Sequence, residues 1–383
     1  MPQDATASNV VVIGGGVIGL AVAWRVAQRG RAVCVLERDE LGAGTSHVAA
    51  GMLAPVTEAD PGELALLELG LRSARAWPAF AAELRGASGA DPGLRRCGAL
   101  VVARDADEAA ALERELALRL ELGLPVERLL PSAARRLEPA LAPTLRLALA
   151  VPGDHAADPR ALVLALAEAA RRAGATLRTG ASAQAIRADA RGRVVGVELA
   201  GGELVEAGEV VVAAGAWSGA IAGLAPVALR PVKGQIMRLR DPEGPGLLER
   251  IVRFEGGYLV PRGDGRYVLG ATMEERGFDT TVTAGGLYEL LRDAGELVPG
   301  IHELVVEETA AGLRPATPDN APLLGRAEEL DGLVWATGHH RNGILLAPVT
   351  ADIVAAVLDG ADAPAAFAPG RFARARARER ATA

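Results

Sequence analysis

A glycine-rich turn between an apolar strand and a helix constrains this chain more than any other feature. The motif Gly-x-Gly-x-x-Gly at residues 14–19 follows an apolar run over residues 10–13 and opens a helical pattern over residues 17–28. A second apolar run, residues 32–36, comes directly afterwards. A strand–helix–strand unit with this motif at its first turn is typical of dinucleotide-binding folds. We therefore predict a parallel sheet whose first turn holds a nucleotide pyrophosphate.

Each glycine of the motif has a separate physical role. Gly14 allows the tight turn, Gly16 lets a pyrophosphate approach the backbone at a helix N-terminus, and Gly19 lets helix and strand pack closely. Glu37 ends the second strand. Its carboxylate can accept hydrogen bonds from a ribose diol and would repel a 2′-phosphate, which favours FAD or NAD over NADP. Arg38, the next residue, weakens that exclusion.

Composition and charge exclude several other classes of protein. The chain of 383 residues has 41 Lys and Arg against 48 Asp and Glu, a net charge of −7, which gives no general case for nucleic-acid binding. The two cysteines, Cys34 and Cys97, are too few for a disulfide scaffold and fit a reducing compartment. Because no cluster of His, Cys, Asp and Glu has ligand spacing, we expect no metal.

The two ends of the chain carry no targeting signal that we recognise. Residues 1–9 hold one acid and no Lys or Arg, unlike a signal peptide, and residues 10–24 are too short and too glycine-rich to span a membrane. Residues 371–380 hold five arginines and one acid, which we interpret as a solvated end. We expect a cytoplasmic enzyme with no membrane partner; a homo-oligomer is left open.

Helices and short strands then alternate in mixed order. The expected elements are helices over residues 61–84, 105–122, 159–173, 283–298 and 345–358, and strands over residues 99–103, 145–151, 183–188, 194–199, 203–206, 210–214, 235–239, 251–254, 257–261, 266–270, 305–309 and 333–337. This order predicts an α/β fold, a Rossmann-like domain with a parallel sheet interrupted by a largely antiparallel substrate domain. The predicted boundaries are 1–84, 152–225 and 308–383 for the nucleotide domain, and 85–151 and 226–307 for the substrate domain.

Four segments carry a resemblance to a known family. They are residues 42–55, which end in AAGMLAP, residues 211–218 (VVAAGAWS), residues 312–325, and residues 337–348 (TGHHRNGILLAP). In this order they resemble the D-amino-acid oxidase family of FAD-dependent oxidoreductases, and residues 49–55 resemble its glycine oxidase branch, which serves thiamine biosynthesis. The matches extend over most of the chain. They imply a D-amino-acid-oxidase-like fold and FAD rather than NAD.

The resemblance also implies where the cofactor lies. Residues 42–52 follow the first motif with hydroxyls and bare backbone, and Gly343 opens the last helix without an acid in its first turn. A helix N-terminus there would favour negative charge on the flavin. The residues expected around FAD are Gly14, Gly16, Val17, Ile18, Gly19, Glu37, Arg38, Thr45, Ser46, Ala49, Ala50, Gly51, Met52, Ala183, Ala214, Gly215, Trp217, His340, Arg341, Asn342, Gly343, Ile344 and Leu345.

Four side chains are the candidates for substrate binding. Arg314 stands in an apolar stretch, and a guanidinium can hold a carboxylate by two parallel hydrogen bonds. The resemblance implies that Arg314 clamps the amino-acid carboxylate, that the Tyr258 hydroxyl reaches it, that Arg341 is a second nearby cation, and that Met273 lines the pocket. An internal ion pair for Arg314, a surface or indirect supporting role for Arg341, and plain packing for Tyr258 and Met273 remain the alternatives.

Covalent attachment of the flavin is not expected. His47 comes just before the small-residue run, but Val48 intervenes where related amine dehydrogenases place their linking His directly before an Ala pair. Neither cysteine lies in the region where sarcosine oxidases of this fold carry a linking Cys. We therefore expect non-covalent FAD.

Three functions stay open at this point. The first is oxidation of glycine, sarcosine and small D-amino acids to the imine or 2-oxo acid, with hydride transfer to flavin N5 and O2 reduced to hydrogen peroxide. The second is a related D-amino-acid or amine dehydrogenase that passes electrons to a quinone or a partner protein. The third is a flavin-binding module without oxidase activity, against which a complete Arg314 and Tyr258 pocket argues.

Overall fold

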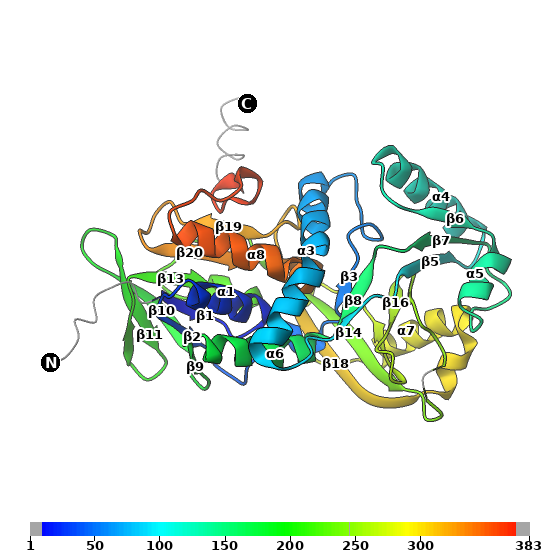
Figure 1. Ribbon diagram of the computed structural model, residues 1–383, viewed down its shortest axis with the longest axis horizontal. Coiled ribbons are helices and arrows are strands. Elements are labelled where there is room, and N and C mark those ends of the chain that lie inside the picture. The colour runs from blue at the N-terminus through cyan, green and yellow to red at the C-terminus, as the bar shows by residue number, and fades with distance from the viewer. Residues whose placement is uncertain (1–9, 245, 373–383) are drawn as a thin grey trace.

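The computed structural model describes residues 10–244 and 246–372, so most of the arginine-rich end lies outside the described residues. Two large sheets lie at opposite ends of the long axis, joined by the long strands β14 and β18 (Figure 1). The predicted α/β fold, a parallel nucleotide-binding sheet with an inserted antiparallel domain, is confirmed.

The first sheet is parallel except at one edge. Its centre is the predicted strand–helix–strand unit, in which β1 pairs with β2 on one side and β13 on the other, all parallel. Only β19 runs antiparallel to its neighbour among the strands described. In spatial order the strands are β19 (Leu323–Arg326), β20 (Leu333–Thr337), β13 (Glu209–Val212), β1 (Val10–Ile13), β2 (Val33–Leu36) and β9 (Thr176–Arg178).

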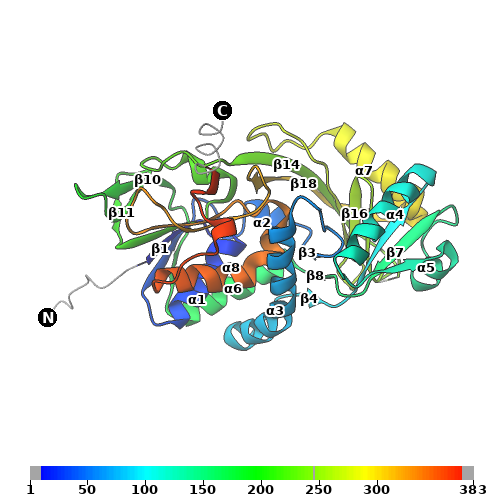
Figure 2. The same ribbon diagram turned by 90° about the horizontal axis from the view of Figure 1, so that it is seen from above.

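Alternate residues of β1 face two different layers. Val10 and Val12 pack into a core shared with helices, whereas Val11 and Ile13 pack into a core shared with a small antiparallel sheet. Figure 2 shows the helices on one side of the parallel sheet and the small sheet on the other. The helices are α1 (Val17–Gln28), α3 (Leu64–Ser88), α6 (Pro159–Arg172) and α8 (Gly343–Leu358); the small sheet is β10 (Ala183–Ala188), β11 (Val194–Leu199) and β12 (Leu204–Glu206).

The second sheet is antiparallel except where β5 and β15 meet. In spatial order its strands are β18 (Val305–Ala316), β14 (Arg230–Arg240), β17 (Arg266–Gly270), β16 (Gly257–Pro261), β15 (Ile251–Phe254), β5 (Ala99–Ala103), β7 (Leu147–Val151) and β6 (Glu127–Leu129). Helices α5 (Pro131–Leu137) and α7 (Ala284–Leu297) pack beside it, as does α4 (Ala106–Glu121). Strands β14 and β18 are longer than predicted, which extends this sheet toward the parallel one.

Short elements complete the junction between the two sheets. A second small sheet contains β3 (Met52–Leu53), β8 (His155–Ala157) and β4 (Leu94–Arg95), and the short helix α2 (Thr45–Val48) lies against β18. The predicted domain boundary at residue 84 falls inside α3, and the boundary at residue 308 falls inside β18. The domain division therefore remains a proposal, with β18 belonging to the larger sheet by its pairing.

A capping signal in the sequence marks the start of α6. The Asp158 carboxylate accepts a hydrogen bond from the Arg160 amide, and Pro159 occupies the first position of α6. The stretch His340–Leu358 is long and apolar enough to cross a membrane, with a mean hydropathy of 1.4, but 78% of its most apolar window is buried inside the fold. It packs against α1 and α3, as a core helix does.

Candidate functional site

The glycine motif makes the turn that its sequence predicts. Gly14 has φ +111°, and a Cβ atom there would lie 2.5 Å from the Ala213 carbonyl oxygen. A Cβ on Gly19 would lie 1.9 Å from the Gly14 carbonyl oxygen, so any side chain would separate α1 from β1. At Gly16 a Cβ would reach 3.3 Å from the Ser46 hydroxyl, at the edge of an open cavity.

Glu37 closes the same turn from the neighbouring strand. Its carboxylate accepts hydrogen bonds from the Gly15 amide (2.7 Å) and the Asp39 amide (3.0 Å). Each carboxylate oxygen has a second lone pair, and Glu37 lines the cavity, so it can still accept from a ribose diol. The Arg38 guanidinium lies 4.1 Å from the centre of the Trp217 ring, a cation–π contact at this end of the cavity.

The small-residue segment lies directly against the first turn. The Ser46 hydroxyl accepts a hydrogen bond from the Val17 amide (3.0 Å) at the start of α1, and the Thr45 hydroxyl donates to the Leu313 carbonyl (2.6 Å). Helix α2 thus links the glycine turn to β18 through these two hydrogen bonds. His47, on the same helix, does not line the cavity, and its Nε2 lies 2.5 Å from the Arg160 guanidinium instead.

The start of α8 presents polar groups to the cavity. Gly343 and Ile344 line it, and no side chain caps the helix, so the positive end of its dipole faces the cavity. Burial lowers the pKa of His339 and that of His340 to about 3, so both imidazoles are neutral at physiological pH. The His340 Nδ1 atom is buried with no hydrogen-bond partner among the described residues.

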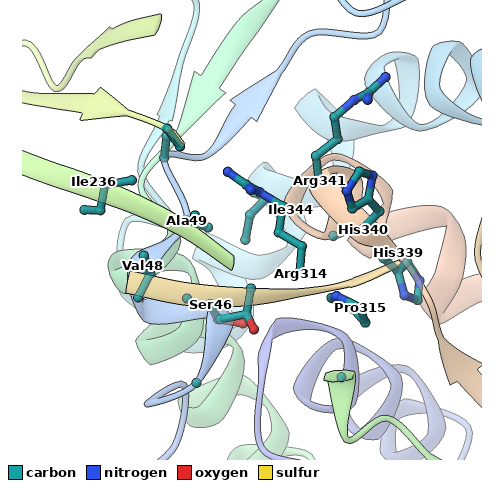
Figure 3. Close-up of a pocket in the computed structure, with 18 of the residues that line it drawn as sticks. Ser46, Val48, Ala49, Ile236, Arg314, Pro315, His339, His340, Arg341 and Ile344 are labelled. Carbon is teal, nitrogen blue, oxygen red and sulfur yellow. The ribbon is translucent and has the colours of Figure 1, made fainter. Parts of the chain in front are cut away.

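Arg314 projects from β18 into the cavity, between Ala49 and the start of α8 (Figure 3). Its guanidinium donates to the carbonyl oxygens of Thr272 (3.1 Å) and Lys233 (3.4 Å). No carboxylate of the described residues forms an ion pair with it, in contrast to most other arginines here. Gly234, on the paired strand β14, makes room for it, because a Cβ there would lie 2.4 Å from the Arg314 Nη2 atom.

Tyr258 stands beside Arg314 on β16. Burial raises the pKa of its phenol, while the nearby Arg314 guanidinium acts in the opposite direction, so the hydroxyl keeps its proton at neutral pH. Gly270, its partner on β17, leaves space for the ring, since a Cβ would lie 2.9 Å from the phenol oxygen. A protonated phenol and a guanidinium together form a donor pair for a carboxylate.

The other two substrate candidates lie at the cavity wall. The Arg341 guanidinium lies 3.3 Å from a carboxylate oxygen of Glu58 and 3.2 Å from one of Glu63, so its charge is already balanced. Met273 is 67% exposed on the loop of residues 271–283. Gln235 fastens this loop, because its side-chain amide bonds Glu274 and Thr283.

All these groups share a cavity of about 1110 Å³ that runs between the two sheets. It contains the four substrate candidates and most of the residues predicted around FAD. Three of the predicted residues do not line it: Gly19 packs inside the turn, Asn342 lies at a separate small pocket, and Leu345 also lies there while its carbonyl accepts from Ser73 and Trp77. Sequence reasoning missed Gly234 and Gln235, although a glycine inside a strand signals a close approach.

Gly234→Ala is expected to raise the KM for a carboxylate substrate about tenfold and to leave FAD content unchanged. The added methyl group displaces the Arg314 guanidinium, and small misplacements of a binding group are costly. Gly285→Ala is the matched control, because Gly285 lines the same cavity and its Cβ would meet open space. Steady-state kinetics measure both; equal KM values in the two variants would contradict the prediction.

Comparison with known proteins agrees with this geometry. The sequence profile of the family described as FAD dependent oxidoreductase matches residues 9–357. The chain belongs to this family of FAD-dependent oxidoreductases. Within it, the chain falls with the glycine oxidase type of amino-acid oxidase.

Three relatives support that placement. Glycine oxidase of Geobacillus kaustophilus (strain HTA426) is 38% identical over 370 residues, 96% of this chain and 97% of that protein. The crystal structure of glycine oxidase from Geobacillus kaustophilus has a TM-score of 0.87 at 37% identity and covers 95% of this chain and 99% of that one. The bifunctional protein ThiO/ThiG of Trichormus variabilis is 37% identical over 91% of this chain, which spans about half, 52%, of that protein.

The residues present fit FAD. The open edge at Gly16, the uncapped start of α8 and the unpartnered His340 Nδ1 are places where a bound group would supply missing contacts. Glu37 lines the cavity beside the glycine turn, where a nucleotide ribose would lie, and Arg314 lines the same cavity from β18. Among the described residues, no three His, Cys, Asp or Glu side chains are grouped to hold a metal ion.

Proposed function

We propose that this protein oxidises glycine, and also sarcosine and small D-amino acids, with FAD as the cofactor and O2 as the electron acceptor. Glycine, O2 and water would give glyoxylate, ammonia and hydrogen peroxide. The observation that carries the proposal is Arg314, a half-buried cation in the cavity with no carboxylate partner among the described residues. Such a cation is a preformed site for the carboxylate of an amino acid.

The residues of this chain act by holding and orienting the substrate. Arg314 and the protonated Tyr258 hydroxyl donate to the carboxylate, which fixes the α-carbon relative to the cofactor. When bound, FAD would supply the redox chemistry, as the acceptor of a hydride from the α-carbon and the donor of electrons to O2. The start of α8 favours negative charge in the same part of the cavity.

The two neutral histidines fit a mechanism in which the chain positions the substrate and FAD supplies the redox chemistry. Since the pKa values of His339 and His340 are lowered to about 3, neither adds a positive charge to the cavity at neutral pH. His339 Nε2 lies 3.0 Å from the Thr350 hydroxyl, which holds its ring in place. We infer that rate enhancement comes from alignment rather than from a histidine base.

A substrate panel under air tests the proposal. Glycine, sarcosine and D-alanine should each give one hydrogen peroxide per substrate oxidised. Substrate oxidation without stoichiometric peroxide would favour the dehydrogenase alternative, and no oxidation of any amine would sink both. Because the resemblance is to the glycine oxidase of thiamine biosynthesis, we further propose that the imine product supplies the thiazole part of thiamine.

The cofactor is proposed to be bound without a covalent link. The purified protein should be yellow and should release its flavin into the supernatant on acid precipitation, because His47 points away from the cavity and the cysteines lie elsewhere. Absorbance of supernatant and pellet measures this. Flavin that stays with the pellet would contradict the prediction and would make His47 the first candidate for the link.

A further inference from the structure

The cavity continues past Tyr258 along the same face of the larger sheet. Arg253 on β15 stands directly opposite Tyr258 on β16 in an antiparallel pair. Directly opposed residues of such a pair project from the same face, with Cβ atoms about 5 Å apart. Both side chains line the cavity, and so do Gly256 and Gly257, which add no side chain between them. A substrate held at Tyr258 therefore lies next to a second guanidinium.

Arg253 forms one long ion pair and no side-chain hydrogen bond among the described residues. Its Nη1 atom lies 3.6 Å from a carboxylate oxygen of Glu115 on α4, which is too long for a hydrogen bond. The hydrogen bonds of the described residues include none from the Arg253 guanidinium, whose side chain is 31% exposed. The guanidinium thus keeps its donors for water or for a ligand in the cavity.

A second cation shares the same carboxylate. The Nη2 atom of Arg119 lies 3.0 Å from Glu115, and the Arg119 side chain is 0% exposed. Its Nε and Nη2 atoms donate to the carbonyl oxygens of Val56 and Thr57, while its Nη1 atom has no hydrogen-bond partner in the part of the chain that the structure describes. Two guanidinium groups thus face the Glu115 carboxylate, and the buried Asp154 carboxylate, which accepts from the Val56 and Thr57 amides, also acts on Arg119.

The other acids that line this end of the cavity leave the Arg253 guanidinium available. Asp293 on α7 lines the cavity, but its carboxylate is bound to Arg104 (3.1 Å) and Arg292 (2.8 Å). Glu289 on the same helix is exposed, where solvent screens its charge. The chemistry that matches the wall formed by Arg253 and Arg119 is an anion.

We propose that Arg253, supported by Arg119, forms a second anion subsite. The site then accepts small amino acids with a second carboxylate that lies one or two carbons beyond the amine or the α-carbon. The α-carboxylate binds Arg314 and Tyr258, and the second carboxylate accepts hydrogen bonds from Arg253. This rests on the proposed function and narrows its substrate class. Arg253 acts here as a specificity-determining residue.

Two matched substrate pairs test the subsite. N-(carboxymethyl)glycine differs from sarcosine, and D-aspartate from D-alanine, by one added carboxylate. The measured quantity is the ratio of kcat/KM between the members of each pair, so that general losses cancel. We expect Arg253→Gln to lower the ratio at least tenfold in one pair or both, Arg253→Lys to lower it less, and Glu115→Gln to raise it, because the competing carboxylate is gone.

Arg276→Gln is the control, because this substitution also removes one positive charge from the cavity lining. Arg276 lies on the loop of residues 271–283. Its ratios should stay within about twofold of the wild type. A wild-type enzyme that oxidises sarcosine, but for which neither dicarboxylate is a substrate or a competitive inhibitor, overturns the inference. So does an Arg253→Gln ratio within twofold of the wild type in both pairs, or an equal drop in Arg276→Gln. Failure to oxidise glycine, sarcosine and D-alanine would instead sink the proposed function.

Discussion

Arg314→Ala is expected to raise the KM for glycine at least about thirtyfold while the flavin spectrum stays that of the wild type. Losing one partner of a buried, hydrogen-bonded charge pair costs about 2–5 kcal/mol, and every 1.4 kcal/mol is tenfold. The lesion lies at the substrate end of the cavity, away from the glycine turn, so FAD content should not change. Steady-state kinetics with peroxide detection, together with the absorbance spectrum, measure both effects.

Two further variants sharpen this result. Arg314→Lys should recover only part of the affinity, because an ammonium cannot form the planar pair of hydrogen bonds. Arg276→Ala, which removes another cation of the same cavity, should leave the KM for glycine within about twofold. Near-normal glycine turnover in Arg314→Ala would move the anchoring role to Arg341, whose charge is balanced by Glu58 and Glu63 in this structure.

Glu37→Ala is expected to weaken FAD binding at least about tenfold and to leave the KM for glycine of the remaining holoenzyme nearly unchanged. A hydrogen bond from a ribose hydroxyl to a charged group contributes about 1.5–3 kcal/mol. The variant also loses the hydrogen bonds from the Gly15 and Asp39 amides, which hold the turn. Titration of the apoprotein with FAD, followed by flavin fluorescence, measures the affinity.

Asp39→Ala is the control for the loss of a negative charge beside the glycine turn. It removes a neighbouring carboxylate from the same end of the cavity but leaves the Asp39 amide, and hence its hydrogen bond to Glu37, in place. Its FAD affinity should stay within about threefold of the wild type. Unchanged affinity in Glu37→Ala would show that another residue holds the ribose.

The sequence predicted the nucleotide sheet well because local and global signals agree there. Residues 10–13 and 17–28 match β1 and α1, since a short apolar run, a glycine turn and a helix are all encoded within twenty residues. The strands at 251–254, 257–261 and 266–270 also match, because each is a short, mainly apolar run, and the three are separated by short segments that contain glycine. In these parts of the chain, residues close together in the sequence determine the secondary structure.

The strand that carries Arg314 was predicted only in part. The sequence indicated a strand over residues 305–309, whereas β18 continues to Ala316 through Gly312 and Pro315. Both residues argue against an interior strand, but β18 is the edge strand of its sheet, where proline is tolerated. Pairing with β14, far away in the sequence, decides this segment, and no local pattern reports it.

The candidate site was predicted as a set of residues but not as an arrangement. Arg314 and Tyr258 were found through the resemblance, and their neighbourhood depends on Gly234 and Gly270, whose bare backbones leave room for them. The charge balance of Arg341 depends on acids nearly 300 positions away in the chain. Such contacts between distant segments follow from the fold and cannot be derived from spacing.

The position of Arg314 within a strand has a consequence for how the substrate range of such an enzyme can change. The carboxylate anchor is built into the β14–β18 ladder, paired from Arg230 to Arg240, whereas Met273, Glu274 and Arg276 line the cavity from the loop of residues 271–283. The loop meets the anchor at the Thr272 carbonyl, which accepts a hydrogen bond from Arg314. Because that contact uses a backbone atom, natural variation or laboratory selection of the loop side chains can change the range of amines accepted while the carboxylate anchor keeps its residues.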